Sequence, residues 1–268
     1  MLSNTETQRL RIIKMTQTSK AFPYSSFIPN YVNGLGLSND ATTPNTKLDV
    51  AIGSILDSSG TFQLSLSAPV VINAAANGLN GLDTGALAAS TVYAVHLVAD
   101  PVTQQASGCM VSLSASAPLL PFGYSAFALI GHVVTDGSSH FLKGYWSAGN
   151  SGHRVFMYDA PQATAITAGA ATSYTAVDLS ASVPAVDNRP VWIASAFNPN
   201  AAGHAFKMQP YSATGDAIII NGQVASVVVN SNSYLFSKLN SGKPEINYLV
   251  ANGSDAVAIN VAGYDFLL

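Results

Sequence analysis

The five histidines are the side chains best suited to metal binding or proton transfer near neutral pH. They are scattered along the chain: His96, His132, His140, His153 and His204. His132 and His140 flank an Asp136-Gly137 turn and are expected to approach each other across a hairpin, but a cross-strand pair without a third carboxylate or cysteine ligand is typical of a structural contact. The single cysteine, Cys109, lies in an alternating strand pattern that favours a buried thiol. We therefore predict no metal site.

The acidic residues offer a second kind of chemistry, because a glycosidase needs two carboxylates on either side of a sugar bond. Most of them instead stand in turn sequences, where aspartate bonds the local backbone: Asp40, Asp57, Asp83, Asp100, Asp136, Asp216 and Asp255. The signatures of a serine nucleophile elbow, a zinc-protease helix and paired zinc-binding cysteines are missing. Ser241-Gly242-Lys243-Pro244 lacks the upstream glycine and the hydroxyl residue of a phosphate-binding loop. We predict that the chain is not an enzyme and holds no cofactor.

The tyrosines and tryptophans of the second half suit either a sugar-binding platform or an ordinary core and interface, and the sequence leaves both open. Loops on a rigid scaffold tolerate the variation that recognition requires, so a receptor contact is expected on residues 198–204, 211–216 and 230–242. Their Asn, Ser, Gly and Tyr residues can hydrogen-bond to and stack on sugars, although they also make ordinary turns. The predicted receptor-contact residues are Tyr211 and Tyr234.

Composition narrows the class of protein. The chain has 268 residues, of which 48% are hydrophobic and only 9% charged, with a formal net charge of −3 at pH 7. Without a concentrated basic face, no nucleic-acid partner is predicted. No apolar run of about 18 residues predicts membrane insertion, and the N-terminus lacks the pattern of a secretory signal, so synthesis in the cytoplasm without processing is expected. So little charge suggests a surface covered by neighbouring subunits.

Residues 1–32 differ from the rest of the chain. Four of the eleven basic residues fall within the first twenty positions, where Glu6 is the sole acidic residue. One or two helical turns are possible near residues 8–15, and residues 21–29 read as an extended, proline-limited linker whose aromatic rings need a packing partner. We predict an arm that docks on another protein, with a solvated terminus as the alternative. The docking residues would be Arg9, Arg11, Lys14, Phe22, Tyr24 and Phe27.

Period-two alternation predicts a first β-domain over residues 33–149. Its expected strands cover residues 47–57, 61–67, 70–79, 91–98, 109–114, 127–134 and 140–146. Strand 47–57 is expected to form a hairpin with 61–67. Strand 127–134 is expected to do the same with 140–146, because Asp-Gly favours a tight turn.

A second series of strand-like segments begins after Asn150-Ser151-Gly152, which marks the expected boundary of a second domain over residues 150–268. Its expected strands cover residues 154–158, 172–178, 190–197, 205–210, 217–220, 224–229, 245–250 and 257–266. Short strands separated by turn signals are typical of an antiparallel sandwich. The predicted fold is therefore all-β, with two antiparallel sandwich-like domains after the N-terminal arm.

Three stretches carry a family resemblance: "GLDTG" at 81–85, "STVYAVHLVADP" at 90–101 and "APLLPFGYSAFALIGHVVTDGSSHF" at 117–141. In this order they resemble a β-domain of tail-fibre and other tail-associated structural proteins of tailed bacteriophages. The resemblance covers about residues 33–146 and brings no catalytic residues with it. The closing "AVAINVAGYDF" also resembles the last strand of C-terminal sandwich domains in phage tail proteins.

The resemblance implies a virion structural protein, with a tail-fibre or fibre-adaptor subunit as the leading expectation. Such a protein would reside in the tail and attach through its arm to other tail or head-to-tail junction proteins. A homotrimer is expected, because the fibre resemblance joins a low-charge β-chain with sheet edges to bury. Two alternatives stay open: a carbohydrate- or receptor-binding module that acts through its C-terminal sandwich on host surface polysaccharide, and a capsid decoration protein.

Overall fold

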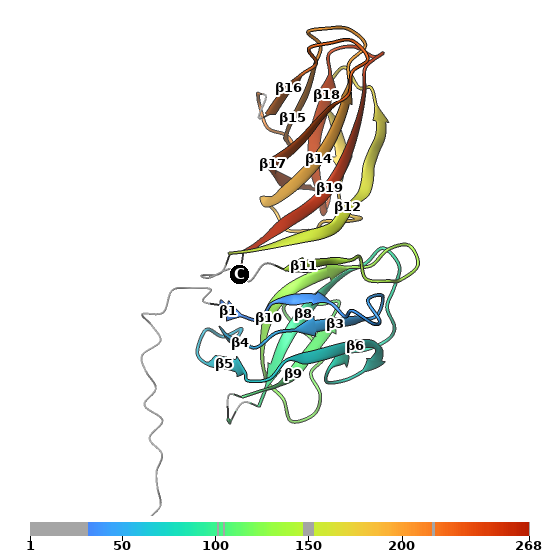
Figure 1. The fold of residues 1–268 in the computed structure, drawn as a ribbon. Coiled ribbons are helices and arrows are strands. Elements are labelled where there is room, and N and C mark those ends of the chain that lie inside the picture. The colour runs from blue at the N-terminus through green and yellow to red at the C-terminus, as the bar shows by residue number, and fades with distance from the viewer. Residues whose placement is uncertain (1–31, 101, 104, 147–152, 216–217, 268) are drawn as a thin grey trace, which may run out of the picture.

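The computed structural model describes residues 32–100, 102–103, 105–146, 153–215 and 218–267. Within these residues the chain is all-β, and no helix able to cross a membrane is found among them. Figure 1 shows the strands in two groups, which we call the first lobe (β1–β11, residues 32–146) and the second lobe (β12–β19, residues 153–267). The predicted all-β, sandwich-like fold is confirmed. The predicted domain boundary at 149/150 lies outside the described residues.

The first lobe is built from eleven short strands. They are β1 (Val32–Gly34), β2 (Leu37–Asn39), β3 (Lys47–Val50), β4 (Gly53–Leu56), β5 (Gln63–Leu66), β6 (Val70–Asn77), β7 (Gly81–Leu82), β8 (Val92–Ala99), β9 (Ala106–Ser112), β10 (Ala126–Val134) and β11 (Gly144–Trp146). Hydrogen-bonded neighbours run in the order β10-β8-β9-β7-β6-β3-β2-β11, and β1-β4-β5 form a separate sheet. Alternate apolar residues of both sheets, such as Leu48, Leu64, Ile72 and Leu97, are fully buried between them.

The strand predicted over residues 47–57 is wrong as a single strand, whereas its predicted hairpin partner is correct. β3 pairs with β2 and β6, and β4 pairs with β1 and β5 in the other sheet. The chain changes sheet at Ala51-Ile52, whose backbone groups bond to Gly36 and Leu35 rather than to a neighbouring strand. Local alternation continues through this corner, so the sequence pattern does not reveal it.

The hairpin predicted between residues 127–134 and 140–146 forms only next to its turn, where Leu142 N donates to Val134 O (2.8 Å), and is wrong beyond it. The Asp136 turn exists, because its carboxylate accepts the backbone N–H groups of Ser138 (2.8 Å) and His140 (2.9 Å). Beyond one bridge from Thr135 to Phe141, however, β11 leaves β10. β10 pairs along its length with β8, and β11 pairs with β2 and with β12 of the second lobe. Long-range partners therefore override the local turn signal.

The second lobe has eight strands. They are β12 (His153–Gly169), β13 (Thr175–Asp178), β14 (Arg189–Asn198), β15 (Ala205–Pro210), β16 (Ile218–Asn221), β17 (Val229–Asn240), β18 (Lys243–Val250) and β19 (Ala256–Leu267). One layer has the order β12-β19-β14-β17, and the other contains β16-β15-β18 with β13 beside β18. The far end of β17 joins the two layers by pairing with β18. The inner faces meet at Phe197 and Phe206, whose ring centroids lie 5.9 Å apart.

Aromatic rings fill the junction between the lobes. Trp146, at the end of β11, packs on Phe156 of β12 and on Tyr264 and Phe266 of β19, with ring centroids 5.0, 5.6 and 5.6 Å away. All four side chains are at most 5% exposed. The Tyr264 hydroxyl donates to the backbone carbonyl of His132 in β10 (3.1 Å), so each lobe contributes both rings and backbone to one packed core.

Arg154 of β12 ties the second lobe to three backbone carbonyls of the first. Its guanidinium Nη1 donates to Leu35 O (2.8 Å) and Ile130 O (3.1 Å), and Nη2 donates to Gly34 O. Gly34 (φ +66°), which ends β1, and Leu35 (φ +55°) are both left-handed, and Ile130 is the extra residue of a bulge in β10, so these carbonyls come from irregular backbone at strand ends and bulges. Arg154 is fully buried, and burial lowers its pKa to about 10, so it remains charged at neutral pH.

Candidate functional site

The outer face of the layer β19-β14-β17 carries large aromatic side chains. In β17 the outward residues include Tyr234 and Phe236, which are 42% and 45% exposed, whereas three inward positions hold serine (Ser231, Ser233 and Ser237) beside the buried Leu235. Inside, the serines satisfy one another and the backbone; Ser237 Oγ, for example, donates to Arg189 O (3.1 Å). Core formation does not explain why large rings face solvent while serines face inward. This face is therefore the candidate site.

One buried carboxylate fixes the aromatic part of this face. Asp265 of β19 is 1% exposed, and its two oxygens accept from Trp192 Nε1 (3.0 Å) and from the Tyr234 hydroxyl (2.7 Å). The two rings stand edge to face with centroids 4.9 Å apart, and Phe236 continues the row 6.2 Å beyond Tyr234. Because the polar atoms of Trp192 and Tyr234 are already bonded, these side chains offer their ring surfaces to a ligand.

The electrostatics of this cluster keep Tyr234 a hydrogen-bond donor. Burial raises the pKa of the Tyr234 hydroxyl to about 12, and the hydrogen bond to Asp265 and its negative charge act in the same direction. Beneath the face, the guanidinium of Arg189 donates to the backbone carbonyl of Asp265 (2.8 Å) and lies over the Tyr264 and Phe266 rings. This places a positive charge near the carboxylate on the core side.

Next to the rings lies a shallow hollow of about 310 Å³ with an alanine floor and asparagine sides. Strand pairing sets Asn232 and Asn260 on either side of Ala194, and Asn230 beside Ala196. The amide groups of Asn230, Asn232 and Asn260 make no side-chain hydrogen bond within the described part of the chain. Each amide therefore keeps two donors and a carbonyl acceptor for a ligand.

The two predicted receptor-contact residues fall in different places. Tyr234 belongs to this face, but residues 230–240 form strand β17, so the loop predicted there is wrong; the exposed loop precedes it at 222–228. Tyr211 follows β15 in the opposite layer, and the structure does not place it on the face with Tyr234. Trp192, Asp265 and the three asparagines were not predicted as site residues. A strand prediction over residues 230–237 would have placed Asn230 and Asn232 on the same side as Tyr234, whereas Trp192, Asp265 and Asn260 join them only through strand pairing.

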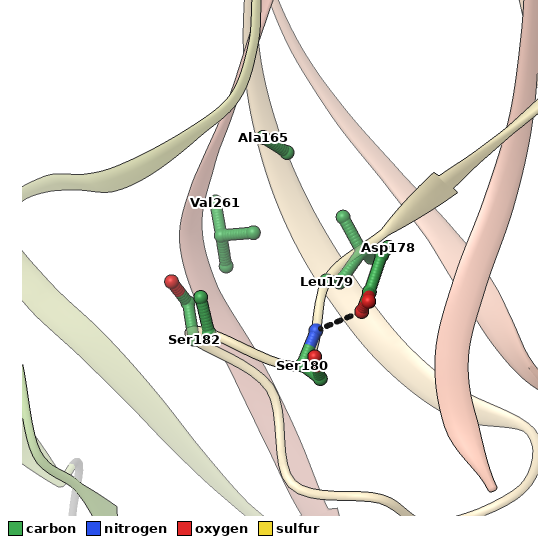
Figure 2. A pocket seen from close by; sticks show the side chains of 7 residues that line it. Ala165, Asp178, Leu179, Ser180, Ser182 and Val261 are labelled. Carbon is green, nitrogen blue, oxygen red and sulfur yellow. Dashed lines mark hydrogen bonds between the residues drawn. The ribbon is translucent and has the colours of Figure 1, made fainter. Parts of the chain in front are cut away.

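A second hollow, of about 250 Å³, opens beside β13 and the turn that follows it (Figure 2). Ser182 and Val261 line one side, and Asp178 lines the other. The Asp178 carboxylate is committed to the backbone N–H of Ser180 (2.8 Å) and to Lys243 Nζ (2.6 Å). Ser182 Oγ lacks a hydrogen-bond partner among the described residues, and the carboxylate of the lining, Asp178, is already bonded to Ser180 and Lys243 and makes no bond to it.

The aspartates expected in turns have that role at every described position. Their carboxylates accept backbone N–H groups at Asp40, Asp57, Asp83, Asp100, Asp136 and Asp255. Asp216 lies outside the described residues. At Asp136 the hydrogen bond from the His140 backbone is the main cause that lowers the pKa of the carboxyl.

His132, His140, His204 and the cysteine have structural surroundings. His132 is buried against Phe266, whereas His140 lies in the turn beside Asp136, and no group of three or more possible ligands is found in the described residues. His204 Nδ1 lies 2.8 Å from the Asp255 carboxylate. Cys109 is buried as predicted, and burial raises the pKa of its thiol to about 12.

The predicted docking residues Arg9, Arg11, Lys14, Phe22, Tyr24 and Phe27 all lie outside the described residues. Comparison with known proteins found no matching family model and no similar curated protein. The candidate site therefore stands on its own geometry.

Proposed function

We propose that the chain is a structural protein of a tailed bacteriophage particle, a tail-fibre or fibre-adaptor subunit that attaches through residues 1–32. The sequence resemblance over residues 33–146 supports this proposal. The observation that carries it is the buried junction, in which Trp146 packs against the second lobe and Arg154 bonds to the first. Two β lobes with one shared core form a stiff unit, which suits a part that holds a fixed position on a particle.

The proposed fibre role includes a homotrimer. The chain has only 9% charged residues and ends its main sheet at β10 on one side and β16 on the other, so two strand edges are left for neighbours to cover. Light scattering at micromolar concentration is expected to give about three times the chain mass of 27.7 kDa. A monomer mass at that concentration contradicts this part of the proposal.

Attachment is tested by removing the arm. Deleting residues 1–30 is expected to leave a folded β-protein that no longer enters particles, measured by immunoblot of purified virions assembled in its presence. Two full-length variants separate the contributions, one with Arg9, Arg11 and Lys14 changed to Gln and one with Phe22, Tyr24 and Phe27 changed to Ser. Normal incorporation of the deleted chain would show that attachment lies elsewhere.

A second candidate function is a carbohydrate- or receptor-binding module in the second lobe. The observation that favours it is the outward row of Trp192, Tyr234 and Phe236 beside three asparagines whose amides are not used by the protein. This function is compatible with the first, because a fibre subunit can also carry a recognition surface.

A further inference from the structure

We propose that the outer face of β19-β14-β17 binds a neutral glycan, with the Trp192 and Tyr234 rings as the stacking surface and Asn230, Asn232 and Asn260 as the hydroxyl-binding groups. This inference rests on the second candidate function and names its site and ligand class. A pyranose has apolar C–H faces and a rim of hydroxyls, so it needs an aromatic surface and groups that both donate and accept hydrogen bonds. The face supplies both kinds of group side by side.

The aromatic end is already arranged for stacking. The Asp265 carboxylate holds Trp192 Nε1 and the Tyr234 hydroxyl at 3.0 and 2.7 Å, so both side chains are oriented before a ligand arrives. Such preorganisation reduces the entropy lost on binding. Asp265 itself is 1% exposed and both its oxygens are engaged, which makes it a positioning residue and not a ligand contact.

The polar end is matched to hydroxyl groups. The register places Asn232, Ala194 and Asn260 in one row across the three strands, and Tyr234, Trp192 and Gly263 in the next. Residues two apart on a strand are about 7 Å apart along it, so the amide row and the ring row lie within reach of one short oligosaccharide. Alanine between the asparagines leaves the hollow into which a sugar edge fits.

The charge of the face selects a neutral ligand over an acidic one. The two rows, together with Asn230, Ala196 and Ala258 in the third, contain no lysine or arginine. The Asp265 carboxylate bonds to the polar atoms of both rings, and the Arg189 guanidinium partly balances its charge from the core side. Because these rows offer no cation to pair with a carboxylate or phosphate group, acidic glycans gain no ion pair there and are expected to bind more weakly than neutral ones.

The test is affinity electrophoresis of the full chain through native gels that contain defined neutral polysaccharides (dextran, mannan, galactan or β-glucan) or acidic ones (alginate, polygalacturonate or hyaluronate). Saturable retardation by at least one neutral polysaccharide is expected, with weaker retardation by acidic ones. Trp192→Ala and Tyr234→Ala are each expected to weaken binding about tenfold or more, which is the effect of losing about 1.4 kcal/mol. Asn232→Ala, which breaks no hydrogen bond within the described protein, should weaken it several-fold.

Phe122→Ala is the matched control, since this aromatic residue of the first lobe is fully exposed in the loop before β10 and belongs to no strand of the second-lobe face; it should bind like the unchanged chain. Retardation by no neutral polysaccharide, or equal retardation by acidic ones, would overturn the proposal. So would loss of the oligomer in light scattering for Asn232→Ala, which would make the face a subunit interface. Because particle incorporation is measured separately, normal incorporation without glycan binding would reject this inference and leave the virion role intact.

Discussion

Replacing Arg154 by alanine is expected to lower the free energy of unfolding by about 3 to 5 kcal/mol, because three backbone carbonyls lose their shared donor in a buried site. The guanidinium bonds to Gly34, Leu35 and Ile130, all in the first lobe, from a strand of the second. These carbonyls belong to two left-handed residues and a bulge, where the strand geometry is irregular and a buried donor is hard to replace.

The same arginine is the main polar link between the lobes, so its loss should affect the junction before either lobe's own core. Trp146 reports on this directly, since it packs on Phe156, Tyr264 and Phe266 next to the Arg154 strand. Urea unfolding of the full chain followed by tryptophan fluorescence is expected to show a lower midpoint for Arg154→Ala. Arg154→Lys keeps the charge but not the planar fork of donors, so it should recover only part of the stability.

Lys243→Met provides the control for the removal of a cation. Unlike Arg154, Lys243 contacts an acidic side chain, Asp178, at 2.6 Å on the exposed surface, where water screens the pair. This variant is expected to unfold close to the unchanged chain. An Arg154→Ala midpoint indistinguishable from that of Lys243→Met would show that the junction does not depend on the guanidinium.

Arg154 also shows how much of a buried contact can be predicted from the alternation of residues along a strand. The strand over residues 154–158 was predicted, and Arg154 shares its parity with Phe156 and Tyr158, both of which are buried. The pattern therefore placed a charged side chain on an inward face, where it must find polar partners. Which partners these are could not be predicted, because Gly34, Leu35 and Ile130 are brought to it by pairing between distant parts of the chain.

The binding face was predicted only in part for a similar reason. Tyr234 was selected, but its surroundings were read as a loop because residues 230–237 are rich in Asn and Ser. No polar/apolar alternation marks a strand there, since four polar residues precede Tyr234-Leu235-Phe236, yet the structure turns the serines and Leu235 inward and the two aromatic rings outward. Asp265 could be assigned to the site only after strand pairing placed β19 beside β14, since Trp192 and Asp265 are 73 positions apart.

For the hairpin predicted at Asp136, the local turn was predicted correctly, but the strand pairing inferred from it was wrong. The turn forms, yet β11 takes β2 and β12 as partners and so becomes the bridge between the lobes. A turn sequence specifies the local direction of the backbone. It does not specify which strand the returning chain will find.

Acidification from pH 7 to pH 5 is expected to remove about 2 kcal/mol of stability through His132 alone. Burial is the main cause that lowers the pKa of His132 to about 3, and the charge of Arg189 and the nearby His96 act in the same direction. The unfolded chain binds a proton at this histidine near its ordinary pKa of 6.5, while the folded chain keeps the ring neutral. Below pH 6.5 the unfolded state therefore holds more protons, and stability falls as pH falls, by about 1.4 kcal/mol per pH unit until the folded pKa is reached.

Because His132 lies where the two lobes meet, we expect this loss of stability to act on the junction between them. Its ring meets Phe266 of the second lobe edge to face at 5.2 Å, and its backbone carbonyl accepts from the Tyr264 hydroxyl. His132→Met keeps an apolar side chain of similar size without a titrating group, so its urea midpoint should change less between pH 7 and pH 5, with the remaining change due to His96, whose pKa burial also lowers. His140→Gln, at a partly exposed histidine of the Asp136 turn, should leave the pH dependence of the unchanged chain in place.

The range above pH 5 is chosen because turn aspartates such as Asp57 and Asp255, whose pKa values are lowered in the folded chain, add their own loss of stability only in more acidic solution. Equal midpoint changes in the unchanged chain and in His132→Met would assign the acid sensitivity to another group.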